Sequence, residues 1–279
     1  MEETEVVLGN RWFLQSFAAA RRLRWMQSNS MGVDLILRQA GPQLRSITLT
    51  CVRGVYEDEL AEHALALLLG VTRGLRAALE DYQRRQWGRW SLTTLAGRRS
   101  LVLGWGAIGR AVGIRLRALG MHVQGVRRSV EGPPVRDADQ FVVHGPATWR
   151  QELATTDVLL VTLPWTSATE GCVGRSELQS LPASAVVVNV GRGAVMDEAA
   201  LFELLREGRL AGAGLDTLIN EPPAADADVW NVPRLLLTPH VGRSLETGSP
   251  RWEPVFEENL RRFWQGLPLL HVVDQQAGY

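Results

Sequence analysis

The chain has 279 residues, of which 46% are hydrophobic and 22% charged, and its 30 basic side chains balance its 30 acidic ones. These values are typical of a soluble globular protein with one large or two ordinary domains. The balance excludes a global field that would attract nucleic acid or an anionic membrane. Every basic side chain is an arginine, which excludes Schiff-base lysine chemistry and the lysine of a Walker loop.

Targeting, redox and metal signals are weak. The acidic start, Met1 to Glu5, has no signal-peptide run, and Arg or Gly interrupts every apolar stretch before about 18 residues. Cys51 and Cys172 form no CxxC motif, which favours a reducing compartment. No His, Cys or acidic cluster has metal-ligand spacing. We expect a cytoplasmic protein with no metal site and no membrane or nucleic-acid partner.

The N-terminal part predicts a few short elements. Apolar runs favour strands at residues 5–8, 23–27 and 47–51, and residues 13–22 have helical spacing. Apolar side chains recur at helical spacing over residues 57–82, and three acids occupy the first turn, where the helix dipole favours negative charge. We expect one long helix there. His63 lies on its apolar stripe, which favours a place in the core or at an interface.

From Ser100 strands and helices alternate. Strands are predicted at residues 101–103, 122–126, 158–163, 185–190, 211–215 and 235–237, and helices at 108–119, 149–154, 177–181 and 198–207. This predicts an α/β fold, a doubly wound parallel sheet with helices on both faces. A helix at 252–264 and an extended tail at 267–273 follow. We expect a dinucleotide-binding domain at residues 89–252 and a substrate domain from residues 1–88 plus 253–279.

A glycine-rich turn joins the first strand of this sheet to its helix: Gly104-Trp105-Gly106-Ala107-Ile108-Gly109. Gly104 permits the tight turn, Gly106 lets the backbone approach a pyrophosphate, and Gly109 lets the helix pack closely on the strand. The pyrophosphate would bind the N–H groups at the helix N-terminus, Ala107 and Ile108 included. The alternative is a glycine-rich turn without a ligand.

The end of the second strand indicates which dinucleotide binds. NAD sites carry an acid there for the ribose 2′-hydroxyl, but this chain has Arg127, Arg128 and Ser129. Two guanidinium groups and a hydroxyl suit a 2′-phosphate. We therefore expect a preference for NADP(H), with NAD(H) possible. The alternative is that both arginines are solvated surface residues.

Polar residues directly follow three predicted strands: Arg192, Asp216 and His240. The carboxyl ends of strands line the ligand crevice of such a sheet. Arg192 can bind a carboxylate with its planar fork, His240 can move a proton, and Glu221 can favour its imidazolium form. Taken singly, each could be an ordinary surface or loop residue. Together they predict hydride transfer to or from a small 2-oxo or 2-hydroxy acid.

With these motifs the chain resembles the D-isomer-specific 2-hydroxyacid dehydrogenase family, over residues 23–274 and most specifically in 101–109, 186–197, 212–222 and 230–242. The resemblance implies that Arg192 binds substrate, that Glu221 partners the acid/base His240, and that Asp216 lies near the nicotinamide. It also implies two loops. Thr162, Leu163 and Pro164 would pass the cofactor, and the backbone around Met31, Gly32 and Val33 would hold the substrate carboxylate.

The chain departs from the family pattern in two ways. Arg127 replaces the usual acid, and the sequence begins where a middle strand of the family's substrate domain is expected. We expect a shortened, flavodoxin-like second domain, or a true start upstream of residue 1. The resemblance implies a glyoxylate or hydroxypyruvate reductase and a homodimer, to which residues 57–82 would contribute. Two alternatives stay open: a nucleotide-sensing binding protein on the same fold, and a phosphite dehydrogenase-like relative, although Glu221 argues against the formate-specific members.

Overall fold

The computed structural model describes residues 3–9, 19–40, 42–90, 92–243 and 251–279. Its contacts form two units: Met1–Val55, Pro164–Ala168 and Leu245–Tyr279 make the first, and Tyr56–Leu163 and Thr169–Ser244 make the second. Residues 56–88, which the sequence pattern assigned to the substrate domain, group by contact with the second unit. The domain boundary at residue 88 stays a prediction.

The first unit contains a small parallel sheet in the order β1-β2-β3, formed by β1 (Val6–Gly9), β2 (Trp25–Ser28) and β3 (Thr48–Thr50). This confirms the three strands expected from the apolar runs. Between β2 and β3 lie α1 (Asp34–Gln39) and the 3₁₀ helix η2 (Pro42–Ser46), which the sequence pattern did not predict. The helix expected at residues 13–22 lies mostly outside the described residues.

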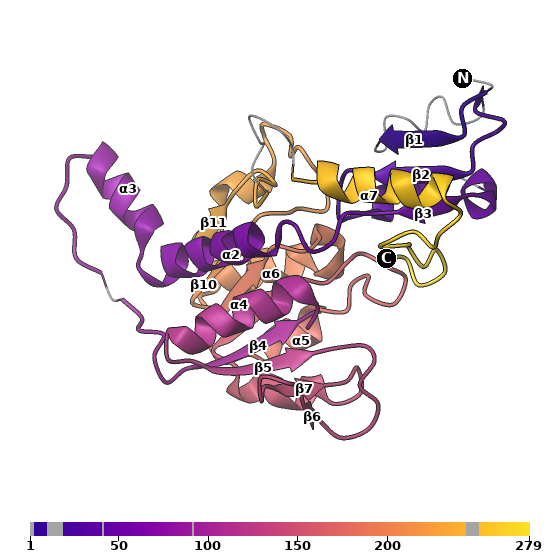
Figure 1. The fold of residues 1–279 in the computed structure, drawn as a ribbon. Helices are drawn as coiled ribbons and strands as arrows, with labels where there is room; N and C mark the ends of the chain where they lie inside the picture. The colour runs from indigo at the N-terminus through magenta and orange to yellow at the C-terminus, as the bar shows by residue number, and fades with distance from the viewer. Residues whose placement is uncertain (1–2, 10–18, 41, 91, 244–250) are drawn as a thin grey trace. The chain divides into compact units, whose positions relative to one another are not determined.

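The C-terminal helix α7 (Glu253–Trp264) completes the first unit (Figure 1). Phe256 and Phe263 stack on the fully buried Trp25 of β2, with ring centroids 5.7 and 5.5 Å apart. The buried Asn259 donates a hydrogen bond to Gln27 Oε1 (3.0 Å). Aromatic packing and a satisfied buried amide thus join the C-terminal segment to the strands.

The second unit holds an eight-stranded sheet in the order β11-β10-β9-β8-β4-β5-β7-β6. Its strands are β4 (Arg99–Leu103), β5 (His122–Val126), β6 (Val135–Arg136), β7 (Val142–His144), β8 (Val158–Val161), β9 (Val186–Asn189), β10 (Gly212–Leu215) and β11 (Leu235–Leu237). All pairs are parallel except β6–β7. The predicted doubly wound sheet is confirmed, with a short antiparallel edge that the sequence pattern did not predict.

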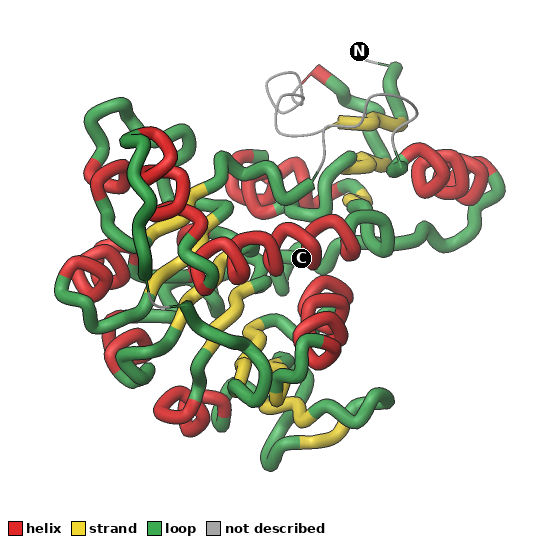
Figure 2. The backbone as a smooth tube through the Cα atoms, turned by 90° about the vertical axis from the view of Figure 1, so that its left-hand side faces the viewer, coloured by secondary structure: helices red, strands yellow, loops and turns green. Residues whose placement is uncertain are grey.

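Helices cover both faces of this sheet (Figure 2). On one face α2 (Glu57–Thr72) and α4 (Ala107–Ala118) pack on alternate strand residues such as Leu160. On the other face α5 (Arg175–Gln179), α6 (Glu198–Arg206) and η3 (Trp149–Thr155) pack on the residues between, such as Leu159. The helix expected at residues 149–154 is a 3₁₀ helix, and η4 (Gly193–Val195) and η5 (Asp228–Asn231) are further short turns.

The single long helix expected at residues 57–82 is wrong. The chain forms α2 and, after a break, α3 (Leu75–Gln83). The break falls at Gly74, whose φ of 67° is left-handed and therefore incompatible with a continuing α-helix. A Cβ atom at Gly74 would lie 2.3 Å from Trp90 Nε1, so a side chain at this position would also collide with the Trp90 ring.

Candidate functional site

The order of the strands reverses at β4. β5 follows β4 in the chain and pairs with one side of it, whereas the later strand β8 pairs with the other side of β4. Ligands of such sheets bind where the strand order reverses, at the carboxyl ends of the strands. Gly104 follows β4 and Thr162 follows β8, and Thr162 Oγ1 donates a hydrogen bond to the Gly104 carbonyl (2.8 Å).

The glycine turn has the geometry of a phosphate cradle. Gly104 has a φ of 102°, and a Cβ atom there would lie 2.7 Å from Thr162 Oγ1. A Cβ atom at Gly109 would lie 2.1 Å from the Gly104 carbonyl oxygen, whereas one at Gly106 would meet nothing within 4 Å. The turn is closed on its protein side and open at Gly106 and Ala107, which start α4. These residues fit a dinucleotide pyrophosphate at a helix N-terminus.

Trp105 anchors this turn. Its ring is 4% exposed, and its Nε1 donates a hydrogen bond to Asp137 Oδ2 (2.8 Å). A Cβ atom at Gly125 of β5 would lie 2.2 Å from the ring. The glycine turn is therefore held between β5 and the loop that carries Asp137.

The end of β5 is exposed and positive. Arg127, Arg128 and Ser129 are all exposed, and the Arg127 N–H donates to the His144 carbonyl (2.9 Å). The His144 ring is buried, and neither ring nitrogen has a hydrogen-bond partner among the described residues. Burial lowers the pKa of His144, although Glu152 acts in the opposite sense. Because a lowered pKa favours the neutral form of His144, Arg127 and Arg128 are the cations at the end of β5.

Arg192 follows β9 on a turn that the buried Asn189 holds. Asn189 Oδ1 accepts the Gly191 N–H (2.9 Å), and its Nδ2 donates to the Arg192 carbonyl (3.0 Å). A Cβ atom at Gly191 would lie 2.6 Å from the Leu163 carbonyl oxygen, so the turn packs on the loop after β8. The sequence pattern placed Asn189 inside the strand expected at residues 185–190 and gave it no role.

Asp216, after β10, is buried and accepts several hydrogen bonds. They come from Thr238 Oγ1 (2.7 Å) and from the N–H groups of Val241 and Gly242 (3.0 Å each). His63 Nε2 lies 3.0 Å from Asp216 Oδ1. Burial alone would raise the pKa of Asp216, but the hydrogen bonds from His63, Thr238 and Val241 and the charge of His63 hold it at about 2. Asp216 is thus a carboxylate at neutral pH.

His63 of α2 therefore belongs to the site region. Its Nε2 also lies 2.9 Å from Thr238 Oγ1. The apolar stripe of the helix indicated only a core or interface position, because the pattern does not show which strand end the helix packs against.

Glu221 and His240 form a direct pair. Glu221 Oε2 lies 2.7 Å from His240 Nδ1, and Glu221 Oε1 accepts the Leu218 N–H (2.7 Å). Burial would raise the pKa of Glu221, but the hydrogen bonds from His240 and Leu218 and the charges of His240 and Arg192 lower it. A carboxylate fixed on Nδ1 sets the ring orientation and leaves Nε2 for proton transfer. Arg192 lies close enough to act on the same carboxylate.

Glu198, which no sequence pattern singled out, is a second carboxyl group beside this pair. It starts α6 directly after Asp197, whose side chain accepts the Ala200 N–H and caps the helix. Glu198 Oε1 accepts the Ile219 N–H (2.6 Å). Burial raises the pKa of Glu198 to about 7; the Ile219 N–H lowers it, and the negative charge of Glu221 raises it further. Two carboxyl groups thus hold consecutive N–H groups of one loop.

The other predicted site residues lie in the first unit. Met31, Gly32 and Val33 connect β2 to α1, and Pro164 follows Leu163 at a crossing between the units. Their roles toward substrate and cofactor stay predictions. In the part of the chain that is described, no group of three or more His, Cys, Asp or Glu side chains could hold a metal ion. Likewise, no described helix is long and apolar enough to cross a bilayer.

We expect Glu198→Gln to flatten the pH dependence of folding stability. The pKa of Glu198 rises from 4.5 to about 7 on folding, so its contribution is fully present below pH 4.5 and is lost as the pH rises through 7. The glutamine oxygen can still accept the Ile219 N–H but cannot ionise. Because Glu198 is partly exposed, we expect a relative gain of only about 1 kcal/mol at pH 8 over pH 5, measured by urea unfolding.

The matched control is Glu207→Gln, which removes an exposed carboxylate from the end of the same helix. If both variants changed the pH dependence of the free energy of unfolding equally, the pKa of Glu198 would not be raised by folding.

Comparison with known proteins agrees with this geometry. Residues 65–242 match the family model described as D-isomer specific 2-hydroxyacid dehydrogenase, NAD binding domain. The chain is 30% identical to D-3-phosphoglycerate dehydrogenase of Archaeoglobus fulgidus over 92% of its own length but only 48% of that protein. It is also 31% identical to glyoxylate/hydroxypyruvate reductase B of Pectobacterium carotovorum, over 80% of this chain and 70% of that protein. The chain thus spans about half the length of the first relative.

Solved structures of the same family match nearly the whole chain. An NADPH-dependent glyoxylate/hydroxypyruvate reductase from Sinorhizobium meliloti, in complex with NADP and sulfate, matches with a TM-score of 0.86 and 28% identity, covering 99% of this chain and 87% of that chain. A D-isomer specific 2-hydroxyacid dehydrogenase family protein from Aeromonas salmonicida matches with a TM-score of 0.85 and 31% identity, covering 98% and 86%. The protein therefore belongs to the D-isomer specific 2-hydroxyacid dehydrogenase family, with an NAD(P)-binding domain at its centre.

Proposed function

We propose that this chain is an NADP(H)-preferring reductase of small 2-oxo acids of the glyoxylate or hydroxypyruvate type. The observation that carries the proposal is the 2.7 Å contact of Glu221 with His240, near Arg192 and in the unit that contains the glycine turn. A protein that only sensed nucleotides would have no chemical need for this paired acid and base.

The residues divide the chemistry among themselves. The Arg192 guanidinium binds the substrate carboxylate. Met31, Gly32 and Val33 are proposed as substrate-binding residues on the resemblance to the family alone. A bound reduced nicotinamide would supply the hydride for the carbonyl carbon. His240 Nε2 donates the proton that the carbonyl oxygen takes up, while Glu221 stabilises the imidazolium that precedes the transfer. In the reverse direction His240 accepts the proton from the 2-hydroxy acid.

We also propose where the dinucleotide is held. Gly104, Gly106, Ala107, Ile108 and Gly109 bind its pyrophosphate. Thr162, Leu163 and Pro164, on the loop after β8, are proposed to lie along the cofactor. Asp216 is proposed to lie near its nicotinamide. The free thiols of Cys51 and Cys172 suit the cytoplasm as its compartment.

His240→Gln is expected to lower kcat for glyoxylate and hydroxypyruvate by about 10² to 10⁴-fold, because the amide cannot donate the proton as an acid. Arg192→Gln is expected to lower kcat/KM by about 10²-fold through loss of a charge-assisted fork. Absorbance of the reduced nicotinamide measures both variants against a panel that includes pyruvate, bulkier 2-oxo acids and phosphite.

The matched control is Arg209→Gln, at an exposed arginine after α6, which should turn over normally. Near-normal turnover in His240→Gln would refute its role. If the wild-type chain binds the dinucleotide but turns over none of the 2-oxo acids, the sensing alternative is correct, and turnover of phosphite alone would identify the phosphite dehydrogenase-like alternative.

The wild-type chain should have a higher kcat/KM with NADPH than with NADH, and Arg127→Gln/Arg128→Gln should lose most of that difference. Each charge-assisted hydrogen bond to a phosphate contributes about 1.5–3 kcal/mol, so we expect a fall of about 10-fold or more with NADPH and little change with NADH. A wild-type preference for NADH, or equal losses with both cofactors, would contradict the assignment of the 2′-phosphate to these arginines.

We propose further that the chain forms a homodimer through α3 and the segment after it. Large apolar side chains there are exposed, among them Leu79 at 62%, Tyr82 at 81% and Trp87 at 98%, and such a concentration marks a surface for association. Leu79→Glu/Trp87→Glu should convert a dimer to a monomer in sedimentation equilibrium. A wild-type monomer, or a dimer that both substitutions leave intact, would contradict this interface.

A further inference from the structure

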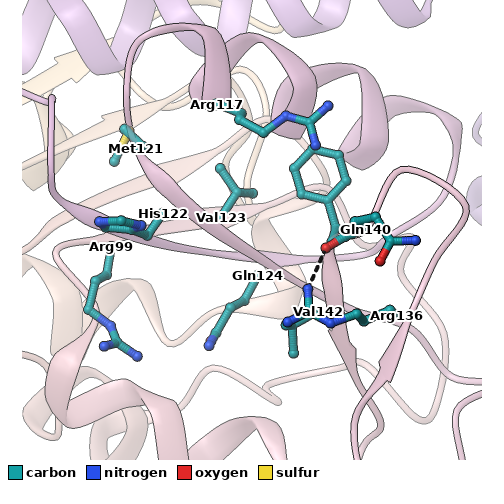
Figure 3. A pocket seen from close by; sticks show the side chains of 10 residues that line it. Arg99, Arg117, Met121, His122, Val123, Gln124, Arg136, Gln140 and Val142 are labelled. Carbon is teal, nitrogen blue, oxygen red and sulfur yellow. Dashed lines mark hydrogen bonds between the residues drawn. The ribbon is translucent and has the colours of Figure 1, made fainter.

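A hollow lies in the second unit, at the edge of the sheet opposite to the glycine turn. It has a volume of about 430 Å³, within the range of small-molecule sites. Its residues come from the start of β4, the end of α4, β5, β6 and the start of β7 (Figure 3). They are Arg99, Arg117, Met121, His122, Val123, Gln124, Arg136, Gln140, Phe141 and Val142. Because β4, β5 and β7 are parallel, their amino ends lie at the edge of the sheet opposite to the carboxyl ends that carry Gly104 and Arg192. Arg136, at the end of the antiparallel β6, lies at the same edge as these amino ends.

The lining is positive and contains no carboxylate. It offers three guanidinium groups, the imidazole of His122 and two side-chain amides. Arg117 and Arg136 bond to the backbone carbonyls of Asp139 and Gln140 (2.9 Å each). Within the described ranges neither has a carboxylate partner. The Arg99 guanidinium has a long contact to Glu152 (3.5 Å), and its backbone N–H donates to Asp157 Oδ2 (2.9 Å), a carboxylate paired with Arg98. The charges of these arginines are therefore weakly compensated.

The nearest acids on the same turn bind other donors. The Asp139 carboxylate bonds to Arg110. The Asp137 carboxylate accepts hydrogen bonds from Trp105 Nε1 (2.8 Å) and from two backbone N–H groups, those of Asp139 and Phe141 (3.0 Å each). Elsewhere in the unit arginines such as Arg150 are closely paired, here with Glu177 at 2.7 Å. Among the described residues, the hollow is distinguished by three arginines that line it together without a close carboxylate partner for their guanidinium groups.

Two of the cations are already held in place. The Arg117 guanidinium stacks on the buried Phe141 ring at 4.1 Å, and the Arg136 fork is fixed by the Gln140 carbonyl. Figure 3 shows Arg117 and Arg136 coming from different elements of the same hollow. Holding the cations beforehand lowers the ordering cost of binding an anion. Phe141 and Met121, both nearly buried, add an apolar floor.

We infer that this hollow is a second binding site, separate from the dinucleotide crevice, for a phosphorylated small molecule of mononucleotide size or less. Planar guanidinium forks bind phosphate oxygens in pairs. Several cations around one hollow favour a ligand with more than one negative charge over a monocarboxylate such as a 2-oxo acid. The inference does not depend on the proposed substrate.

Titration calorimetry with inorganic pyrophosphate and with ADP tests it, on the full chain with its dinucleotide site filled by saturating NADP⁺ or NAD⁺. We expect one further site per chain that weakens with added salt. Arg117→Gln/Arg136→Gln should lower its affinity at least about tenfold, whereas the equally charged control Arg21→Gln/Arg209→Gln, at two exposed arginines, should bind as the wild type does. Equal affinity for both probes identifies a phosphate site alone, and tighter ADP binding identifies a nucleotide site.

Gln124→Glu provides an independent test, because it leaves both arginines in place and adds a carboxylate to the lining. It should also abolish the second site, while dinucleotide binding at the other edge of the sheet stays unchanged. Absence of a second binding event in the wild type, or equal affinity in the wild type and both lining variants, would overturn the inference.

Discussion

The buried carboxylate of Asp216 is the constraint on which the rest of the site depends. It joins β10 to the segment after β11 through Thr238, Val241 and Gly242, and to α2 through His63. The His240 N–H donates in turn to the Asp216 carbonyl (2.8 Å). A carboxylate with this many donors stays ionised while buried. The same residue therefore fixes the backbone from which His240 extends, whatever its contact with the nicotinamide.

A second constraint is the competition between negative charges near His240. Glu221 keeps its charge because His240, Arg192 and the Leu218 N–H stabilise it, whereas Glu198 has one N–H and a negative neighbour. The environments thus move the pKa values of two adjacent carboxyl groups apart, which is typical of sites that move protons near neutral pH. A carboxyl oxygen can accept a hydrogen bond whether the group is ionised or neutral, so protonation of Glu198 does not by itself remove the acceptor of the Ile219 N–H.

Much of this arrangement could be predicted from the sequence, for a physical reason. Parallel strands deliver the residues that follow them to one edge, so strand ends alone bring Arg192, Asp216 and His240 into one region. His63, Asn189 and Glu198 could not be predicted, because their partners are set by how a helix or turn packs on another strand end. The sequence shows a glycine at position 74 within a helical pattern. A glycine alone does not determine whether the helix continues or ends there.

Because the chain has no lysine, the fixed cations at both edges of the sheet are arginines. A guanidinium cannot lose its charge at physiological pH, so its site must compensate that charge or leave it for a ligand. At the carboxyl edge Arg192 acts on Glu221, so its charge is shared with a carboxylate before any substrate arrives. At the amino edge Arg117 and Arg136 have backbone carbonyls and an aromatic ring as partners, which orient the cations without neutralising them. The partly compensated charge of Arg192 suits a singly charged acid that is bound for reaction. The uncompensated charges of Arg117 and Arg136 suit a more highly charged anion that is bound without reacting.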